Sequence, residues 1–184
     1  MDNLATKVLM IDIETLSLKP NAYVTQVGFC AAVLETREYI VLPTSMLTYG
    51  DDVERQPDAD IEFDTICWWM KQDKSVADSI FAQSGVTRHH RHAIFAELQR
   101  VLRLLGDGAT VWASPAMFDL PILTNYFGAK PWKYDVERDM MTLHRVHDPN
   151  GELQPPDNTK LHDAAADAHW QMVYLFNLWE KIHH

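Results

Sequence analysis

A seven-residue run near the start of the chain, residues 7–13, has almost no polar face. Its centre, "VLMI", places apolar side chains on both sides of an extended chain, which predicts a strand buried on both faces. Such a strand needs cover on each side of its sheet, and helices supply that cover in α/β proteins. We therefore expect an α/β fold, with residues 1–184 forming one domain, since 47% of the residues are hydrophobic.

Further strands and helices are predicted along the chain in an order that agrees with this class. Strands are expected over 23–34, 38–42 and 110–114, and the turn-rich segment 148–160 is expected to be a loop. Helices are expected over 61–72 with Asp60 as N-cap, over 94–105 ending at Gly106, from near Asp119 to Gly128, and over 162–182.

The charge balance limits the kinds of partner. The 16 basic and 26 acidic side chains give a formal charge of −10, which argues against a protein that holds long duplexes by neutralising phosphates. A protein that binds the end of a nucleic-acid strand through metal ions remains compatible with this charge. Cys30 and Cys67 form no CxxC pair, and we see neither an apolar run of about 18 residues nor an N-terminal leader. We expect a soluble, cytoplasmic protein with no membrane contact.

The first candidate site residues are Asp12 and Glu14, at the end of the buried run. Side chains alternate along a strand, so the two acids point to the same face, about 6–7 Å apart along the chain. Paired anions raise the free energy unless a cation lies between them, and Mg²⁺ or Mn²⁺ would suit these oxygen ligands. An exposed strand end with two solvated acids is an equally good interpretation of this stretch alone.

Two further groups of polar residues follow. Asp119 comes after the 110–114 strand, where taken alone it is best explained as a helix N-cap. In "HDAAADAHW", Asp163 fits as N-cap and Asp167 lies one turn later on the same face, while His162 just precedes the helix. Helix geometry alone does not decide whether Asp163 or Asp167 would be a metal ligand. The alanines around them are small enough to let this helix lie close against a strand.

The order, spacing and flanking residues of "DIET", "FD" and "HDAAADA" resemble the DEDD superfamily of 3′→5′ exonucleases, in its histidine-bearing branch, DEDDh. "DTICWWMKQ" (residues 64–72) and "RDMMTL" (residues 138–143) are similar to a small subgroup that contains phage exonuclease A and a mycobacterial exoribonuclease. The resemblance implies a ribonuclease-H-like fold, with a mixed five-stranded sheet flanked by helices. It also implies hydrolysis of the terminal phosphodiester at 3′ ends of single-stranded or overhang nucleic acid, releasing nucleoside 5′-monophosphates.

The resemblance further implies two divalent cations, Mg²⁺ or Mn²⁺, and a role for each motif residue. Asp12 would bridge both metals, Glu14 and Asp167 would complete the first site, and Asp119 would hold the second through water. His162 would be the general base for the attacking water, which suits an imidazole with an ordinary pKa near 6.5. The chain after the first motif, Thr15 and Leu16, would meet the terminal nucleotide.

Other residues are candidates for reading the substrate. Trp69 and its neighbour Trp68 lie on different faces of one helix, so they cannot both face the protein core. One of them, which we assign as Trp69, could stack on a base. The alternative, which we favour for the pair, is that one packs inside and the other against a loop or a second subunit. Arg138 and Asp139 are candidates for a substrate contact or a site-supporting ion pair. "RHHRH" (residues 88–92) is best explained as a solvated helix entrance.

Two rival functions remain open on the sequence. A degenerate relative would bind nucleic-acid ends or a partner protein without cutting, although degeneration usually removes one of the acids that are all present here. A different enzyme would cut other phosphodiesters or pyrophosphates with the same metal pair. The Trp-rich helix surfaces would permit a homodimer but do not require one.

Overall fold

The protein is described by a computed structural model covering residues 6–48, 56, 58–81, 87–156 and 162–183. It has a six-stranded sheet in the order β4-β3-β2-β1-β5-β6. The strands are β1 (Lys7–Thr15), β2 (Val24–Val33), β3 (Glu38–Thr48), β4 (Arg88–His89), β5 (Thr110–Ala113) and β6 (Glu137–Asp139). β2 runs antiparallel to both β1 and β3. On the other side of β1, β5 is parallel to β1 and β6 is parallel to β5. The mixed α/β architecture is therefore confirmed.

The sheet has six strands, one more than the resemblance implied and two more than the four that the sequence pattern located. The two strands missing from the prediction, β4 and β6, have two and three residues, too few to carry an alternating pattern. β3 was predicted too short, because it continues through Pro43 to Thr48. The β2–β3 register shifts between Phe29 and Ala31, opposite Pro43, and such an irregularity tolerates a residue without an N–H group.

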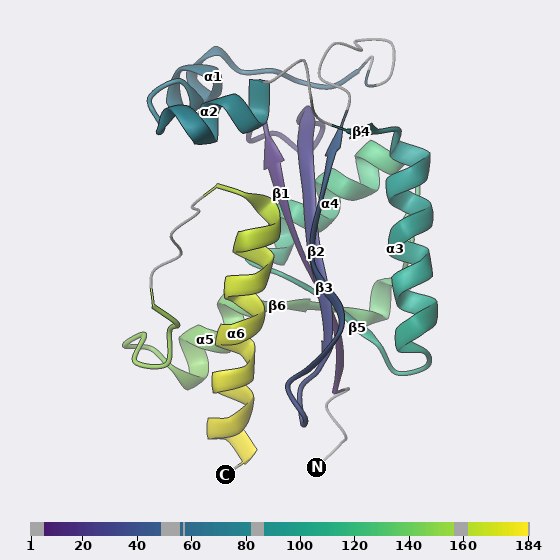
Figure 1. The fold of residues 1–184 in the computed structure, drawn as a ribbon, viewed down its shortest axis with the longest axis vertical. Coiled ribbons are helices and arrows are strands. Elements are labelled where there is room, and N and C mark those ends of the chain that lie inside the picture. The colour runs from purple at the N-terminus through teal and green to yellow at the C-terminus, as the bar shows by residue number, and fades with distance from the viewer. Residues whose placement is uncertain (1–5, 49–55, 57, 82–86, 157–161, 184) are drawn as a thin grey trace.

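Helices cover both faces of the sheet. They are α1 (Phe63–Trp69), α2 (Lys74–Phe81), α3 (Arg91–Leu105), α4 (Ala116–Phe127), α5 (Met140–His147) and α6 (Ala164–His183), with a 3-10 turn η1 (Tyr134–Val136). Leu9 and Ile11 of β1 pack in the cluster that includes α3 and α4, while Val8 and Met10 pack in the cluster that includes α6. The two-sided burial predicted for the first strand is thus confirmed, and Figure 1 shows α3 and α6 on opposite sides of the sheet.

The helix ends differ from the predictions where distant residues decide them. Asp60 is not the cap of α1, which begins after Glu62 without a side-chain cap; Asp60 instead accepts hydrogen bonds from Ser17 Oγ (2.6 Å) and Lys19 Nζ (2.9 Å). Asp119 is not an N-cap either, because α4 begins three residues earlier, after Pro115. The ends of α3 and α4 were predicted correctly, at glycines with φ of 72° and 73°.

One edge of the sheet gathers the parts that matter for the site. β1 and β5 are parallel, so their carboxyl ends lie at the same edge, and α4 follows β5 there. In Figure 1, α6 begins beside the arrowhead of β1, and α1 and α2 lie beyond it. Cys30 and Cys67 are free thiols, and none of the described helices is apolar over enough residues to cross a bilayer.

Candidate metal centre

The carboxyl-terminal half of β1 carries Asp12 and Glu14 on the face that α6 covers. In the β1–β2 ladder, Asp12 lies opposite Gly28 and Glu14 opposite Gln26. Glu14 is 8% exposed and Asp12 is partly buried, so neither acid is a fully solvated strand end. The interpretation of these residues as two solvated acids is therefore wrong.

Gly28 lets the start of α6 approach the sheet beside these acids. A Cβ atom at position 28 would lie 2.0 Å from the main-chain carbonyl carbon of Ala164 and 2.3 Å from the main-chain nitrogen of Ala165. Real Cβ contacts are never this short, so only glycine fits at this place in β2. The alanine-rich sequence predicted that this helix would lie close against a strand, and that prediction is confirmed. Gly28 provides the matching space in β2.

The first turn of α6 separates the roles of its two aspartates. Asp163 Oδ1 accepts a hydrogen bond from the Ala166 N–H group at 3.0 Å, which is the predicted cap. Asp167 Oδ2 accepts one from the His162 N–H group at 3.0 Å. His162 has φ of 63°, in the left-handed region that a residue with a side chain seldom adopts. Ligand atoms of Glu14, His162 and Asp167 lie within 4.8 Å of one another, close enough to share one metal ion.

Asp119 approaches the same group of acids from α4. It is 3% exposed, and its Oδ2 atom has no hydrogen-bond partner among the described residues. Burial raises the pKa of Asp119 to about 8, and the Asp139 carboxylate adds to the rise, whereas main-chain hydrogen bonds at Ile13 and at Asp119 itself oppose it. A buried carboxylate oxygen without a donor is costly unless a cation binds it.

The neighbouring carboxylates add to the raised pKa values of Asp12 and Glu14. Burial raises the pKa of Asp12 well above its usual value, and Asp119, Glu14 and Asp167 add to the rise, opposed by a hydrogen bond from Gln171. The pKa of Glu14 is also raised, by burial and then by Asp167 and Asp119. Oxygen ligands that are buried and lack a countercharge are the donor set that Mg²⁺ and Mn²⁺ prefer. The residues present therefore fit a divalent-cation site.

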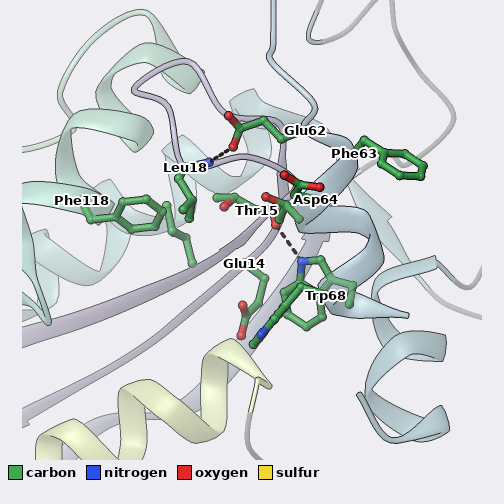
Figure 2. A pocket seen from close by; sticks show the side chains of 11 residues that line it. Glu14, Thr15, Leu18, Glu62, Phe63, Asp64, Trp68 and Phe118 are labelled. Atoms are coloured by element: carbon green, nitrogen blue, oxygen red, sulfur yellow. Dashed lines mark hydrogen bonds between the residues drawn. The ribbon is translucent and has the colours of Figure 1, made fainter. Parts of the chain in front are cut away.

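A pocket of about 810 Å³ opens directly beside Glu14 (Figure 2). Thr15 and Leu18 line it from the end of β1 and the following loop, α1 contributes several side chains, and Phe118 of α4 completes the wall. Figure 2 shows Glu62 at the rim, where its Oε2 atom accepts a hydrogen bond of 3.0 Å from the Leu18 N–H group.

The two tryptophans of α1 have different surroundings, as the alternative favoured for the pair predicts. Trp69 is 2% exposed, and its Nε1 atom donates to the Thr15 carbonyl at 2.9 Å. Trp68 is 43% exposed, and its ring meets the His162 ring edge-on at 4.8 Å between centroids. Both line the pocket, but Trp68 has the larger exposed surface.

Two of the expected substrate contacts lie outside this pocket. Leu16 is buried with Trp69, and its main-chain groups bond to Tyr23 and Glu62. Arg138 is exposed on β6, where its Nη1 atom donates to the carbonyls of Asp135 and Glu137.

Three contacts of the site were not predicted from the sequence, although the sequence singles out Asp139 of "RDMMTL" and Trp68 as residues. Asp139 accepts from the Ala116 N–H group at 2.8 Å, which supports the start of α4, and also caps α5 through Thr142. The Asp-x-x-Thr spacing could have indicated the cap, but not the contact with α4. Gln171 was detectable only as a polar residue one turn beyond Asp167, and the contact of Trp68 with His162 left no local signal.

Solved structures with the same fold include nucleases. The nuclease domain of 3′hExo, a DEDDh family member solved with rAMP, has a TM-score of 0.64 at 9% identity, over 98% of this chain and 94% of that chain. S. pombe Pop2p, solved with Mg²⁺ and Mn²⁺, has a TM-score of 0.58 at 11% identity, over 92% of this chain and 81% of that chain. Product-bound exonuclease I has a TM-score of 0.61 at 14% identity; the match covers 92% of this chain but only 42% of that chain.

These TM-scores establish the ribonuclease-H-like fold, and the sequence itself identifies the family. No curated protein matches the chain in sequence. Residues 7–179 match the family described as the 3′-5′ exoribonuclease Rv2179c-like domain. That match includes all four carboxylates, the histidine before α6 and both subgroup motifs. The chain therefore belongs to the Rv2179c-like 3′-5′ exoribonuclease domain family and is a 3′-5′ exonuclease.

Proposed function

We propose that this exonuclease removes nucleotides from the 3′ ends of single-stranded or overhang nucleic acid, DNA or RNA, as nucleoside 5′-monophosphates. Two divalent cations, Mg²⁺ or Mn²⁺, would be held by Asp12, Glu14, Asp119 and Asp167. The observation that carries this proposal is the convergence of four mutually repelling carboxylates, from β1, α4 and α6, beside a pocket of about 810 Å³. When bound, such cations activate a water molecule and stabilise the charge that develops on the leaving oxygen.

The pocket suits the terminal nucleoside better than a phosphate group. Leu18, Phe63 and Phe118 offer apolar surface to a base, while Glu62 and Asp64 would repel a phosphate. The scissile phosphate would then lie on the side of the pocket formed by the four carboxylates.

The four predicted substrate contacts divide by position. Thr15 and Trp69 line the pocket, but Trp69 is 2% exposed and would support Thr15 from behind, whereas Trp68 has the exposed ring that a base could contact. Leu16 would act through the buried packing behind Thr15. Arg138 would meet only a strand that extends beyond the pocket along β6.

His162 would accept the proton of the attacking water. The hydrogen bond from the main-chain N–H group of His162 to Asp167 fixes the backbone at this position. The edge contacts with Trp68 and Trp69 hold the His162 ring beside Glu14. A general base must be within reach of the water, and this arrangement supports such a position. The competing possibility is direct coordination of a metal by His162, because its ring shares the cluster with two carboxylates.

The test is a digestion of 5′-labelled single-stranded RNA, single-stranded DNA and duplexes with 3′ overhangs, with Mg²⁺, Mn²⁺ or EDTA. We expect stepwise shortening from the 3′ end, nucleoside 5′-monophosphate products, and no reaction in EDTA. Asp12→Asn should be inactive, whereas Asp107→Asn, an exposed acid outside the site, should match the wild type. Internal cleavage, 3′-phosphate products or full activity in EDTA would contradict the proposal. Binding of 3′ ends without cleavage under all conditions would instead support a silent binding module.

A further inference from the structure

Gln171 contacts the central carboxylate of the site from α6. Its Nε2 atom donates a hydrogen bond of 2.8 Å to Asp12 Oδ1, across 159 positions of sequence. Gln171 follows Asp167 by one helical turn, so both side chains project from the same face of α6 toward β1. It is the side chain whose hydrogen bond lowers the pKa of Asp12.

This contact is not explained by packing. Gln171 is 7% exposed, and its Oε1 atom has no partner among the described residues. Its neighbours on the same face of α6, Ala168 and Leu175, are fully or almost fully buried apolar residues. A half-satisfied buried amide is destabilising, so an apolar side chain of the same size would serve the core better. The amide is thus best explained by its contact with Asp12.

The chemistry of an amide suits this position. A lysine or arginine here would neutralise Asp12 and compete with a metal ion, and an ionised glutamate would add a fifth negative charge to the group. A neutral donor fixes one carboxylate oxygen while leaving the negative charge of Asp12 in place. Hydrogen bonds to ligating carboxylates orient them for a metal ion.

We propose that Gln171 is a positioning residue that holds Asp12 Oδ1, so that the second oxygen of Asp12 is oriented toward a divalent cation. This inference rests on the metal-binding role proposed above for Asp12. Gln171 itself touches neither the substrate nor the cation. Its contribution is the geometry of the carboxylate that the cation meets.

The experiment compares wild type, Gln171→Met and a matched control, Gln99→Met, which makes the same change on α3 away from the site. Mn²⁺ binding is measured by calorimetry, thermal unfolding is measured in EDTA, and exonuclease rates are measured over a range of Mn²⁺ concentrations. For Gln171→Met we expect a dissociation constant for Mn²⁺ about tenfold larger and a half-saturating Mn²⁺ concentration raised to match. The metal-free Tm should be equal to or higher than that of wild type, because the half-satisfied amide is removed from the core. Gln99→Met should match the wild type in Mn²⁺ binding and in its half-saturating concentration.

The outcomes separate this inference from the proposed function. Unchanged Mn²⁺ affinity in Gln171→Met would overturn the positioning role, and a lower metal-free Tm alongside it would assign Gln171 to packing. Wild-type protein that binds no Mn²⁺ would overturn the proposed metal site itself. Gln171→Leu, a good helix former that also lacks the donor, must show the same weaker binding, and it replaces Gln171→Met if that variant does not fold.

Discussion

At the scale of single residues, two buried aspartates show how surroundings decide the use of a carboxylate. Asp148 accepts hydrogen bonds from the Glu152 and Leu153 N–H groups and from the Tyr174 hydroxyl. Burial alone would raise the pKa of Asp148, but these bonds hold it below its usual value. Asp119 keeps one oxygen without a donor, and its pKa is raised to about 8. The first aspartate stabilises a loop, whereas the second has coordination capacity left for a cation.

The raised pKa of Asp119 predicts the pH dependence of the metal-free protein. The pKa is 3.8 in an unperturbed chain and about 8 in the folded state, so the folded state binds the proton more tightly. This contribution to the free energy of unfolding is fully present below pH 3.8 and is lost as pH rises from 3.8 through about 8. Asp119→Asn should therefore lose less stability than the wild type as pH rises, measured in EDTA by denaturant unfolding across that window. If the free energy of unfolding changed with pH in the same way in both proteins, the raised pKa of Asp119 would be contradicted.

His162→Ala tests the role of the histidine. We expect kcat to fall by about 10²- to 10⁴-fold, the usual contribution of a general base, because His162 supplies the imidazole of the cluster with Glu14 and Asp167. Mn²⁺ affinity, measured by calorimetry, should stay almost unchanged. Weakened binding of a single ion would indicate that His162 ligates a metal, and loss of both ions would indicate a structural role.

At the scale of elements, the site depends on how closely α6 lies against β2. Gly28 meets the main chain at the start of α6, and Gln26 Oε1 accepts a hydrogen bond of 3.4 Å from the Ala164 N–H group. Since Asp167 and His162 are placed by that turn, a small change in β2 would move both of these residues. Glycine at position 28 is thus required for the site as well as for packing.

Gly28→Ala should both destabilise the protein and weaken Mn²⁺ binding. Overpacking of this kind costs about 1–3 kcal/mol, to be measured by denaturant unfolding. The added methyl group would overlap the main-chain carbonyl group of Ala164 rather than its side chain. The double variant Gly28→Ala, Ala164→Gly should therefore recover neither the lost stability nor the Mn²⁺ binding. Recovery in the double variant would show that a side-chain contact, and not the main chain, limits the approach of α6.

At the scale of the whole molecule, bound metal should add to the stability of a chain with a net charge of −10. The four site carboxylates favour unfolding when no cation is present, because their repulsion is relieved in the unfolded chain. Mn²⁺ at 100 times its dissociation constant should raise the free energy of unfolding by about 2.7 kcal/mol. Thermal melting at increasing Mn²⁺ should show the rise in wild type and in Asp107→Asn, and little of it in Asp12→Asn. An equal rise in Asp12→Asn would place the stabilising ion elsewhere.

Much of the fold could be predicted from the sequence because its signals are local. The apolar run of β1, the 3–4 spacing of α3 and the glycines that end α3 and α4 each act within a few residues of chain. The family motifs are local too, since each places its acids on one strand or one turn of helix. The sequence by itself therefore determined the α/β class, the main elements, the family and the five motif residues of the candidate site.

The tertiary structure alone decided which of these parts meet. The start of α4 is supported by Asp139, 23 positions away, and Asp12 is held by Gln171, 159 positions away. β4 and β6 become strands only because a neighbouring strand pairs with them. The physical reason is the same in each case: a contact between distant segments depends on the packing of the whole chain and leaves no periodic or capping pattern in the local sequence.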